Sequence, residues 1–489
     1  MVKYGECGIV PAMHFARLGR FGICLAVIFP AVLAAAADID FAPLFSSDTD
    51  VVGQRRWRAL GPLLEWKQSD TGRTFLAVHP LYSSVATPLS PVSAERQEVN
   101  LLWPLWVRKQ GDNESKWQFL ALVYASYFDV ANPAGRYQFA VFPIYIQGRD
   151  EEGTPYLALV PLGGVARDFL GRDRISFVLF PLTYADQVDE VKTRAWLWPI
   201  VSSTWGGGHE RFRVFPFYGV SRRRQDYEKR FIFWPVWSSA RYWYPESSGS
   251  GYVLFPLLGH LKLTDQESWM VLPPLMRFSK GAKKSEVNCP WPFFQWSSGE
   301  VRRLYFWPLW GRKTMAGNDS AFVLWPLYHQ ARRYSAVAES TRRMLIPFLY
   351  YTSERKRVRE EPGQGDVVAR TLKVWPLFSS RSSPEGFQLR ALSLFPYKDY
   401  GPIERNYAPL WTLYSHTAGG PVKEDELLWG LFRWRRATTG AAHLSLFPVF
   451  AVDRSAGGDA RGWSVLKGLL GYERTGAKKT IRVLYFLKF

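Results

Sequence analysis

Phe233-Trp234-Pro235-Val236-Trp237 is one copy of a short motif that returns through the whole chain. In each copy, apolar residues lead to Phe or Trp, then to Pro, then to an aliphatic or aromatic residue and often to another aromatic. Other clear copies are Leu102-Trp103-Pro104-Leu105-Trp106 and Leu324-Trp325-Pro326-Leu327-Tyr328. The copies recur at intervals of about 17–21 residues, and an internal repeat this dense sets the fold.

The segments between the copies are polar and have the composition of turns, as in Gly148–Gly153 and Ser221–Asp226. Apolar and aromatic runs bounded by Gly, Asp, Asn and Ser are typical of β-strands. A helical repeat would need about 34 residues for two helices, and a proline at the centre of each unit opposes a helix. The sequence therefore predicts an all-β chain, folded as an antiparallel meander of strand-turn units of roughly 19 residues.

The motif divides into two faces because side chains alternate along a strand. One predicted face holds the residues four and two before the proline, the proline, and the residue two after it. It is almost wholly apolar in four copies, whose outermost members are Phe177 and Thr183, Phe212 and Tyr218, Phe231 and Trp237, and Phe322 and Tyr328. We expect this face to lie on lipid. The other face is polar and is expected to contact water except at its middle. There we expect a lumenal aromatic belt of Trp198, Trp234, Phe255, Trp307, Trp325, Trp375 and Phe447.

The N-terminal segment has the pattern of a secretory signal peptide. Arg17 and Arg20 precede the apolar stretch Ile23–Leu33, which ends in the small-residue run Ala34–Ala37. We therefore expect residues 1–37 to be a signal peptide and residues 38–489 to be a single repetitive β-domain. Only Cys289 lies in that domain, so no disulfide framework is expected.

The last residues alternate as a strand with one apolar face. Ile481, Val483, Tyr485, Leu487 and Phe489 are apolar at every second position up to a terminal Phe. This pattern resembles the C-terminal strand signature of bacterial outer-membrane β-barrel proteins. The resemblance implies a meander of about 22–26 strands, closed as a large transmembrane β-barrel in the cell outer membrane. It also implies that Val483, Tyr485, Leu487 and Phe489 are the signal that the barrel-assembly machinery recognises.

The prolines leave a second architecture open. A proline cannot donate a hydrogen bond to a strand ladder, so it is usually confined to strand edges or bulges. Either each strand kinks at its middle, or the motif marks a corner between two shorter strands. The second option would give a soluble β-repeat solenoid or propeller, located in the periplasm or at the cell surface.

The formal net charge of +19 favours acidic partners. For an exported protein these are outer-membrane lipid or lipopolysaccharide, and no nucleic acid is expected. The basic runs fall at predicted strand ends, where they could pair with lipid phosphates. The predicted anionic-lipid contacts are Arg222, Arg223, Arg224, Arg332, Arg333, Arg435 and Arg436.

No constellation in the sequence predicts catalysis. The seven histidines are scattered without ligand spacing, and no nucleophile elbow, phosphate-binding loop or haem-attachment motif is present. We therefore expect no enzyme activity, no cofactor and no metal. The leading hypothesis is a passive conduit or sheath for a substrate or a partner protein, such as a plug in the lumen. The alternative is a soluble secreted scaffold that binds partners through aromatic surfaces.

Overall fold

The computed structural model describes residues 39–88, 95–132, 134–335, 337–356, 367–485 and 487–489. These residues form one antiparallel ribbon in which each strand pairs with the next, from the β1–β2 pair to the β45–β46 pair. The predicted all-β antiparallel meander is confirmed. The predicted signal peptide at 1–37 lies outside the described residues.

The first strands are β1 (Ile39–Phe41), β2 (Phe45–Thr49), β3 (Arg55–Ala59), β4 (Leu64–Gln68), β5 (Thr74–Val78), β6 (Tyr82–Pro88), β7 (Glu95–Leu101), β8 (Trp106–Gln110), β9 (Ser115–Phe119), β10 (Val123–Tyr127), β11 (Tyr137–Val141), β12 (Tyr145–Arg149), β13 (Pro155–Leu159), β14 (Gly163–Phe169) and β15 (Arg172–Val178). The ribbon continues with β16 (Thr183–Val188), β17 (Val191–Trp196), β18 (Val201–Gly206), β19 (His209–Val214), β20 (Tyr218–Arg223), β21 (Tyr227–Ile232), β22 (Trp237–Tyr244), β23 (Ser247–Leu254), β24 (Leu258–Leu263), β25 (Gln266–Val271), β26 (Met276–Gly281), β27 (Lys284–Asn288), β28 (Phe294–Gly299), β29 (Val301–Phe306), β30 (Trp310–Met315) and β31 (Asn318–Val323). It ends with β32 (Tyr328–Tyr334), β33 (Ala338–Leu345), β34 (Leu349–Lys356), β35 (Val367–Val374), β36 (Phe378–Ser383), β37 (Gly386–Ala391), α2 (Gly401–Asn406), α3 (Ala408–Trp411), β38 (Tyr414–Gly419), β39 (Val422–Leu427), η1 (Leu428–Gly430), β40 (Phe432–Ala437), β41 (Ala442–Leu446), β42 (Phe450–Arg454), η2 (Ala456–Gly458), β43 (Ala460–Val465), η3 (Leu466–Gly468), β44 (Leu470–Thr475), β45 (Lys478–Val483) and β46 (Leu487–Lys488).

The predicted number of strands, about 22–26, is wrong, because the described residues form 46. The motif proline does not lie inside a strand. It lies in a turn, so each unit of about 19 residues is a hairpin of two short strands. Because proline cannot donate to the ladder, the chain reverses at the motif. Of the two options that the prolines left open, the corner between shorter strands is the one that the structure has.

Two chemically different kinds of turn alternate along the ribbon. The motif turns join each odd-numbered strand to the next even-numbered strand, as Phe233–Val236 joins β21 to β22. Polar turns such as Asp189-Glu190 and Arg224–Asp226 join each even-numbered strand to the next odd-numbered strand. Successive turns of an antiparallel meander lie at opposite edges of the sheet. One edge, here named the apolar rim, therefore carries the motif turns, and the other, the polar rim, carries the polar turns.

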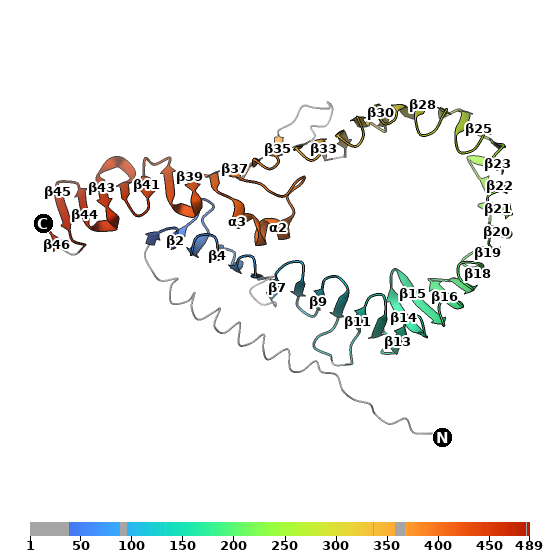
Figure 1. Cartoon of the computed structure of the whole chain (residues 1–489), viewed down its shortest axis with the longest axis horizontal. Helices are drawn as coiled ribbons and strands as arrows, with labels where there is room; N and C mark the ends of the chain where they lie inside the picture. Colours follow the sequence, from blue (N-terminus) through green and yellow to red (C-terminus); the bar gives the residue numbers. More distant parts are fainter. Residues whose placement is uncertain (1–38, 89–94, 133, 336, 357–366, 486) are drawn as a thin grey trace, which may run out of the picture.

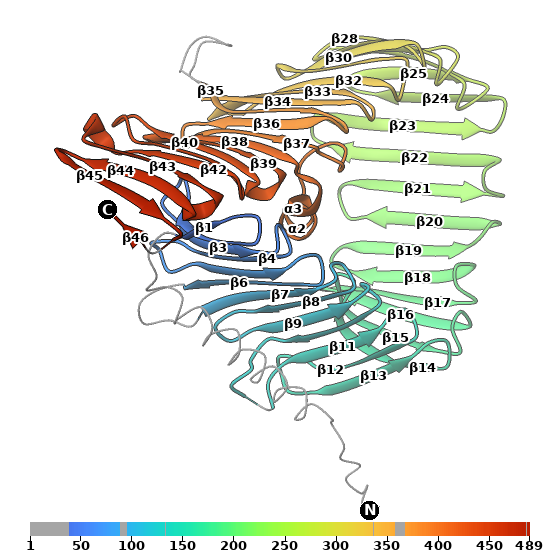
Figure 2. The same cartoon turned by 60° about the vertical axis from the view of Figure 1, so that its left-hand side comes forward.

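The ribbon bends into a ring (Figure 1). It runs from β2 and β4 past β13–β15 and β20–β22 to β28–β30, and returns to its beginning at β37 and β39. Figure 2 shows the strands side by side, with the helices α2 and α3 between the early and the late strands. These helices lie in segment 392–413, which occupies the place of one motif turn and was not expected from the sequence. We name this segment the helical insert.

Neighbouring motif turns are joined to one another. The backbone N–H of Trp325 donates to the carbonyl oxygen of Pro308 at 2.7 Å, and the N–H of Trp198 donates to that of Pro181 at 2.7 Å. Some of the aromatic rings before the prolines also contact the next ring of the series in a tilted arrangement, as do Trp307 and Trp325, whose centroids are 5.8 Å apart. The hydrogen-bonded ladder thus continues through the apolar rim, which stiffens it.

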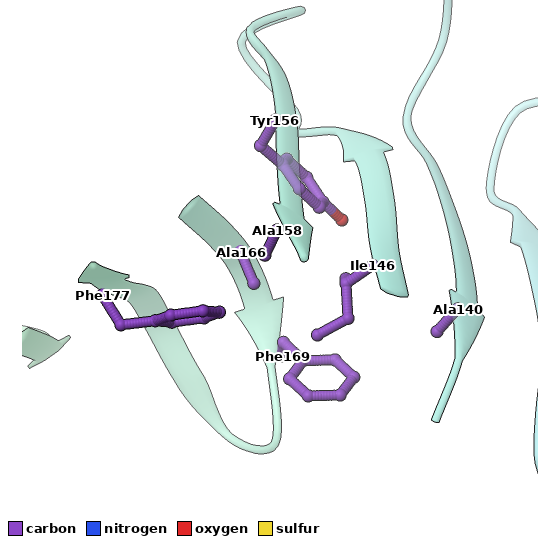
Figure 3. Packing of buried hydrophobic residues seen from close by; sticks show 7 residues of the cluster. All are labelled: Ala140, Ile146, Tyr156, Ala158, Ala166, Phe169 and Phe177. Carbon is purple, nitrogen blue, oxygen red and sulfur yellow. The ribbon is translucent and has the colours of Figure 1, made fainter. Parts of the chain in front are cut away.

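A cluster of buried hydrophobic side chains lies at β11–β15 (Figure 3). Its buried side chains are Ala140, Ile146, Tyr156, Ala158, Ala166, Phe169 and Phe177. Gly164 has a φ of +136° and lies so close to the backbone of Leu157 and Ala158 that a side chain would collide with it. A glycine is therefore required where β14 folds back on β13.

The two faces of the ribbon differ from the predicted ones. The helical insert packs on one face, which looks into the ring in Figure 1 and is here named the inner face. The strand register places Phe231 beside Gly219 and Arg213 on the inner face, whereas Phe212 pairs with Val220 on the outer face. Phe177 and Phe322 are also inner. The four phenylalanines that were predicted to share one face therefore do not: Phe212 is on the outer face, and Phe177, Phe231 and Phe322 are on the inner face. The reason is that turns of three and of four residues differ by one position in the alternation of side chains.

The chain end is a hairpin and not one long strand. Leu484 and Tyr485 have φ angles of +53° and +68° in a turn at the apolar rim. The N–H of Ile481 donates to the carbonyl oxygen of Phe489 at 2.9 Å, and the N–H of Phe489 donates back to Ile481. The alternating strand predicted for Val483, Tyr485, Leu487 and Phe489 is therefore interrupted after Val483.

Candidate functional site

The apolar rim exposes a large apolar side chain in turn after turn. The residue that follows the motif proline is the most regular of these, and Leu309 is 61% exposed. The exposed residues at this position are Leu44, Leu63, Leu81, Ile144, Leu162, Leu182, Ile200, Phe217, Val236, Leu257, Leu275, Phe293, Leu309, Leu327, Phe348, Leu377 and Val449. Scattered exposed apolar residues are normal on a soluble protein, but a contiguous exposed band marks a membrane or protein contact.

The outer face continues this apolar band onto the strands. Its first row, next to the motif turns, is exposed and apolar at Val178, Trp196, Ile232, Leu258, Val271, Phe306, Trp310, Val323, Leu345, Leu446, Phe450 and Leu470. Its second row, two residues further from the turns, mixes exposed tryptophans with arginines. The tryptophans are Trp269, Trp296, Trp434 and Trp463, and the arginines are Arg194, Arg312 and Arg343. Tryptophan and arginine are the side chains that favour a boundary between lipid and water.

The height of the apolar band matches one leaflet of a bilayer. Residues on one face are two apart and lie about 7 Å from each other along a strand. From the tips of the motif turns to the second outer row is therefore about 12–15 Å. The hydrocarbon core of a bilayer is about 30 Å thick, so one leaflet contributes about 15 Å.

The predicted aromatic belt lies at the apolar rim. Trp198, Trp234, Phe255, Trp307, Trp325, Trp375 and Phe447 are all in motif turns, not at mid-height of a strand. The rings are directed over the inner face, as at Trp307 and Trp325, which border a hollow together with Tyr305 and Phe322. The sequence thus identified the series but placed it at the wrong height, because each predicted strand was two strands.

The basic residues predicted to contact anionic lipid lie away from the apolar rim. Arg222 and Arg223 pair with Glu228 and Asp226 near the polar rim, and Arg224 is in a polar turn. Arg332 and Arg333 lie at the polar end of β32, where Arg332 pairs with Glu339 at 2.5 Å. Arg435 forms ion pairs with Asp48 and Glu424, and Arg436 pairs with Asp425 at 3.5 Å.

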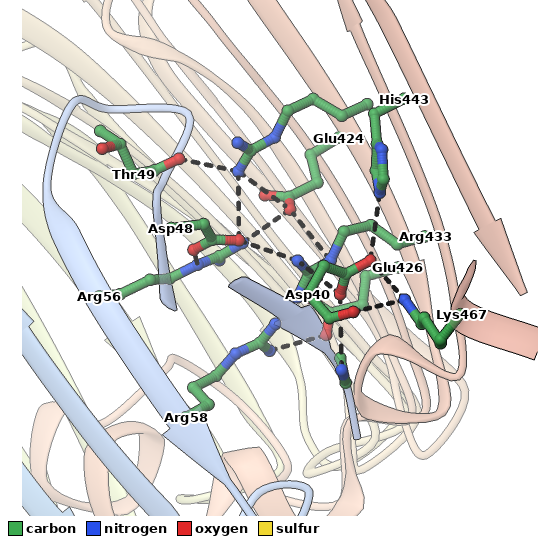
Figure 4. Close-up of polar contacts among 12 residues, drawn as sticks. Asp40, Asp48, Thr49, Arg56, Arg58, Glu424, Glu426, Arg433, His443 and Lys467 are labelled. Atoms are coloured by element: carbon green, nitrogen blue, oxygen red, sulfur yellow. Dashed lines mark hydrogen bonds and ion pairs between the residues drawn. The ribbon is translucent and has the colours of Figure 1, made fainter. Parts of the chain in front are cut away.

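A buried network of charges joins the beginning of the ribbon to the late strands β39–β41 (Figure 4). The inner faces of β2 and β3 meet the inner faces of β39 and β40, and we name this contact the clasp. Its members are Asp40, Asp48, Arg56, Arg58, Glu424, Glu426, Arg433, Arg435, His443 and Lys467. The ring is thus held shut by side chains, while the backbone ladder follows the sequence order of the strands.

The shortest contacts of the clasp connect residues far apart in sequence. Arg56 Nη2 lies 2.6 Å from Glu424 Oε1, and Arg58 Nη1 lies 2.7 Å from Glu426 Oε1. Arg433, whose side chain is 3% exposed, donates from Nη1 to Asp48 Oδ2 at 2.9 Å. Buried charges are tolerated when they are paired with opposite charges, and the clasp pairs each of these side chains. Some of their buried atoms, such as Arg433 Nη2 and Arg58 Nη2, have no hydrogen-bond partner among the described residues.

The protonation of the clasp depends on these pairs. Burial alone would raise the pKa of Asp48, but the charges of Arg56, Arg433 and Arg435 outweigh it and lower the pKa to about 2. Hydrogen bonds to Asp40 and Asp453 raise the pKa of His443 to about 9, against the opposing effect of burial. Both groups are therefore charged at neutral pH.

These shifts predict how the clasp responds to pH. His443 has a folded-state pKa above its usual 6.5, so its contribution is complete below pH 6.5 and is lost as pH rises through about 9. Asp48 has a lowered pKa, so its contribution to stability is complete above pH 3.8 and is lost as pH falls towards 2.

Thermal unfolding between pH 6 and 10 tests the contribution of His443. The wild type should lose up to about 3 kcal/mol over this range, whereas His443→Gln should lose clearly less, and equal losses would contradict the assignment.

The helical insert forms a second contact between the late and the early strands of the ring. Lys373, which is 1% exposed, lies 2.5 Å from Asp399 of the insert and donates to the carbonyl oxygen of Phe395 at 2.9 Å. On the other side, Ser83 of β6 donates to Asn406 Oδ1 at 2.5 Å. The insert therefore connects β35 to the early strands. No motif in the sequence predicted this insert.

Within the described ranges, no helix is long and apolar enough to cross a membrane. The same residues include no group of three or more His, Cys, Asp or Glu side chains that could hold a metal ion. Comparison of the chain with protein-family models and with curated proteins found no match.

Proposed function

We propose that the chain is a membrane-seated β-ring that acts as a passive conduit or sheath, with its apolar rim embedded in one leaflet. The observation that carries this proposal is the strict alternation of turns, which gathers the exposed apolar side chains at one edge of the ribbon. The charged half of each strand then stands in water. The predicted signal peptide at 1–37 supports a location in the outer membrane.

Three features of the band favour lipid over a protein partner. It follows the ring instead of forming a local patch, its height of about 12–15 Å equals one leaflet, and tryptophans and arginines border it. The interior supports the role of conduit. About 34 strand spacings of about 4.8 Å separate β4 from β38, which gives a perimeter near 160 Å and a width of about 50 Å. A ring of that width leaves room for a substrate or a partner protein.

Fluorescent probes at the two rims test this proposal. In a chain whose three cysteines are replaced by Ser, a cysteine is introduced either at Leu309 on the apolar rim or at Leu170 on the polar rim, and labelled with NBD. On binding to phosphatidylglycerol vesicles, the probe at 309 should brighten and be quenched by nitroxides on the acyl chains. The probe at 170 should remain in water and on the side of addition, open to dithionite.

The other readings give different results in the same experiment. A transmembrane barrel would carry one of the two rims across the bilayer, so one probe would be shielded from dithionite without contacting acyl chains. A soluble scaffold would leave both probes unchanged by vesicles. Either result overturns the proposal.

A further inference from the structure

The inner wall of the ring carries a hollow between β29 and β34. Its volume is about 1190 Å³, which exceeds the roughly 300–1,000 Å³ of most small-molecule sites. At the apolar rim it is bordered by Trp307, Trp325 and Ile346, and behind them by Phe322 and Met344. His329 lies between Phe322 and Met344 in the register. An apolar chain that enters from the rim would contact the tryptophan rings first.

Cations border the same hollow further from the rim. The register pairs Lys313 with Ser320, Ser320 with Ala331, and Ala331 with Arg342, so these four residues form one row across the wall. Three strand spacings of about 4.8 Å place the two cations about 14 Å apart. The small side chains of Ser320 and Ala331 leave the space between them open.

These cations are not neutralised by the protein. In the part of the chain that the structure describes, the ion pairs do not include Lys313, Arg342 or Arg333, which lies next in the direction of the polar rim. Among those residues, the carboxylates that border the hollow are Asp319 and Glu354, against the four cations Lys313, Arg332, Arg333 and Arg342. The hollow thus has a net positive charge at one end and an aromatic border at the other.

The same order of chemistry occurs a second time on the wall. A hollow of about 520 Å³ on β19–β25 is bordered by Phe231, Trp234 and Arg213 near the rim and by Arg211 and Lys229 behind them. Here too a serine, Ser221, separates the two cations in the register. Aromatic side chains with two cations behind them thus occur at two places on the inner wall.

We propose that the hollow at β29–β34 binds an anionic phospholipid, with its phosphate between Lys313 and Arg342 and its acyl chains against Trp307 and Trp325. Charge-assisted hydrogen bonds from lysine and arginine are strong contacts for phosphate. This inference rests on the proposed function, since the lipid enters from the leaflet in which the apolar rim is embedded. It gives the conduit a substrate class, because the inner wall would receive lipid from the membrane.

Two double variants test the inference, and they differ by one position along the same strands. Lys313→Gln with Arg342→Gln removes inner cations, whereas Arg312→Gln with Arg343→Gln removes the adjacent cations of the outer face. Each purified chain is kept in solution with an amphipol and titrated with dihexanoyl phosphatidylglycerol by calorimetry. The inner pair should weaken binding about tenfold or more, and the outer pair should not.

Further arms separate this inference from the proposed function. The same variants are mixed with phosphatidylglycerol vesicles and floated. The inner pair should float like the wild type, and the outer pair should float less. Equal titration results for the two pairs would overturn the lipid site without affecting the proposed function. Inorganic phosphate that binds as tightly as the lipid would overturn the role of the acyl chains.

Discussion

Replacing Leu257, Leu309 and Leu377 together by Asp is expected to reduce binding of the chain to vesicles at least about a hundredfold. These residues follow the motif proline in three separate turns of the apolar rim and are 57%, 61% and 56% exposed. Each leucine transferred from water into lipid contributes about 1.5–3 kcal/mol, and each aspartate resists the same transfer. The measurement is vesicle flotation at a series of lipid concentrations.

The chain offers a matched control at the opposite rim. Val52, Leu170 and Val337 lie in polar turns and are 66%, 72% and 71% exposed. Replacing these three by Asp adds the same charge at sites of at least equal exposure. Binding should be unchanged, because the polar rim stands in water. If the two triple variants lost binding equally, the apolar rim would not be the membrane contact.

The repeat was enough to predict the β-meander, because short apolar runs with turn residues between them have few other solutions. It was not enough to count strands. A sequence window around Trp234-Pro235 has the same composition whether the chain passes straight through or reverses. The cue that would have decided between them is the alternation of the intervening segments, since only hairpins make every second turn apolar.

The faces of the strands were harder to predict than the strands. A turn of four residues at Phe233–Val236 and one of three residues at Phe215–Phe217 differ by one position. Because side chains alternate with a period of two, that difference moves Phe231 to the inner face and leaves Phe212 on the outer face. The two turn lengths follow from backbone geometry that the motif residues alone do not specify.

The clasp could not be predicted from the sequence at all. Arg56 and Glu424 are separated by 368 positions, and each looks like an ordinary charged residue of a half-exposed strand. The ion pair exists only because the ribbon bends until its inner faces meet. The same holds for Lys373, whose partners come from the helical insert.

Arg433→Met is expected to open the ring without unfolding the ribbon. Arg433 is nearly fully buried and lies between Asp48, 2.9 Å away, and Glu424, 3.7 Å away. Removing one partner of a buried ion pair costs about 3–5 kcal/mol, since the remaining charges stay buried without compensation. Amide hydrogen exchange should therefore accelerate about 10²–10³-fold in β1–β4 and β38–β41, where local opening limits it, and remain as in the wild type in β20–β25.

The control is Arg436→Met on the same strand. Arg436 lies on the outer face, is 45% exposed and pairs with Asp425 at 3.5 Å, so its removal should cost no more than about 1 kcal/mol.

A second test reverses the charges of one ion pair of the clasp. Arg56→Glu alone should open the clasp, and adding Glu424→Arg should restore part of the protection. Because each strand hydrogen-bonds only to its neighbours in sequence, the ring can open at the clasp while the ladder persists elsewhere. Faster exchange along the whole ribbon in Arg433→Met would show instead that the ring and the ladder form one cooperative unit.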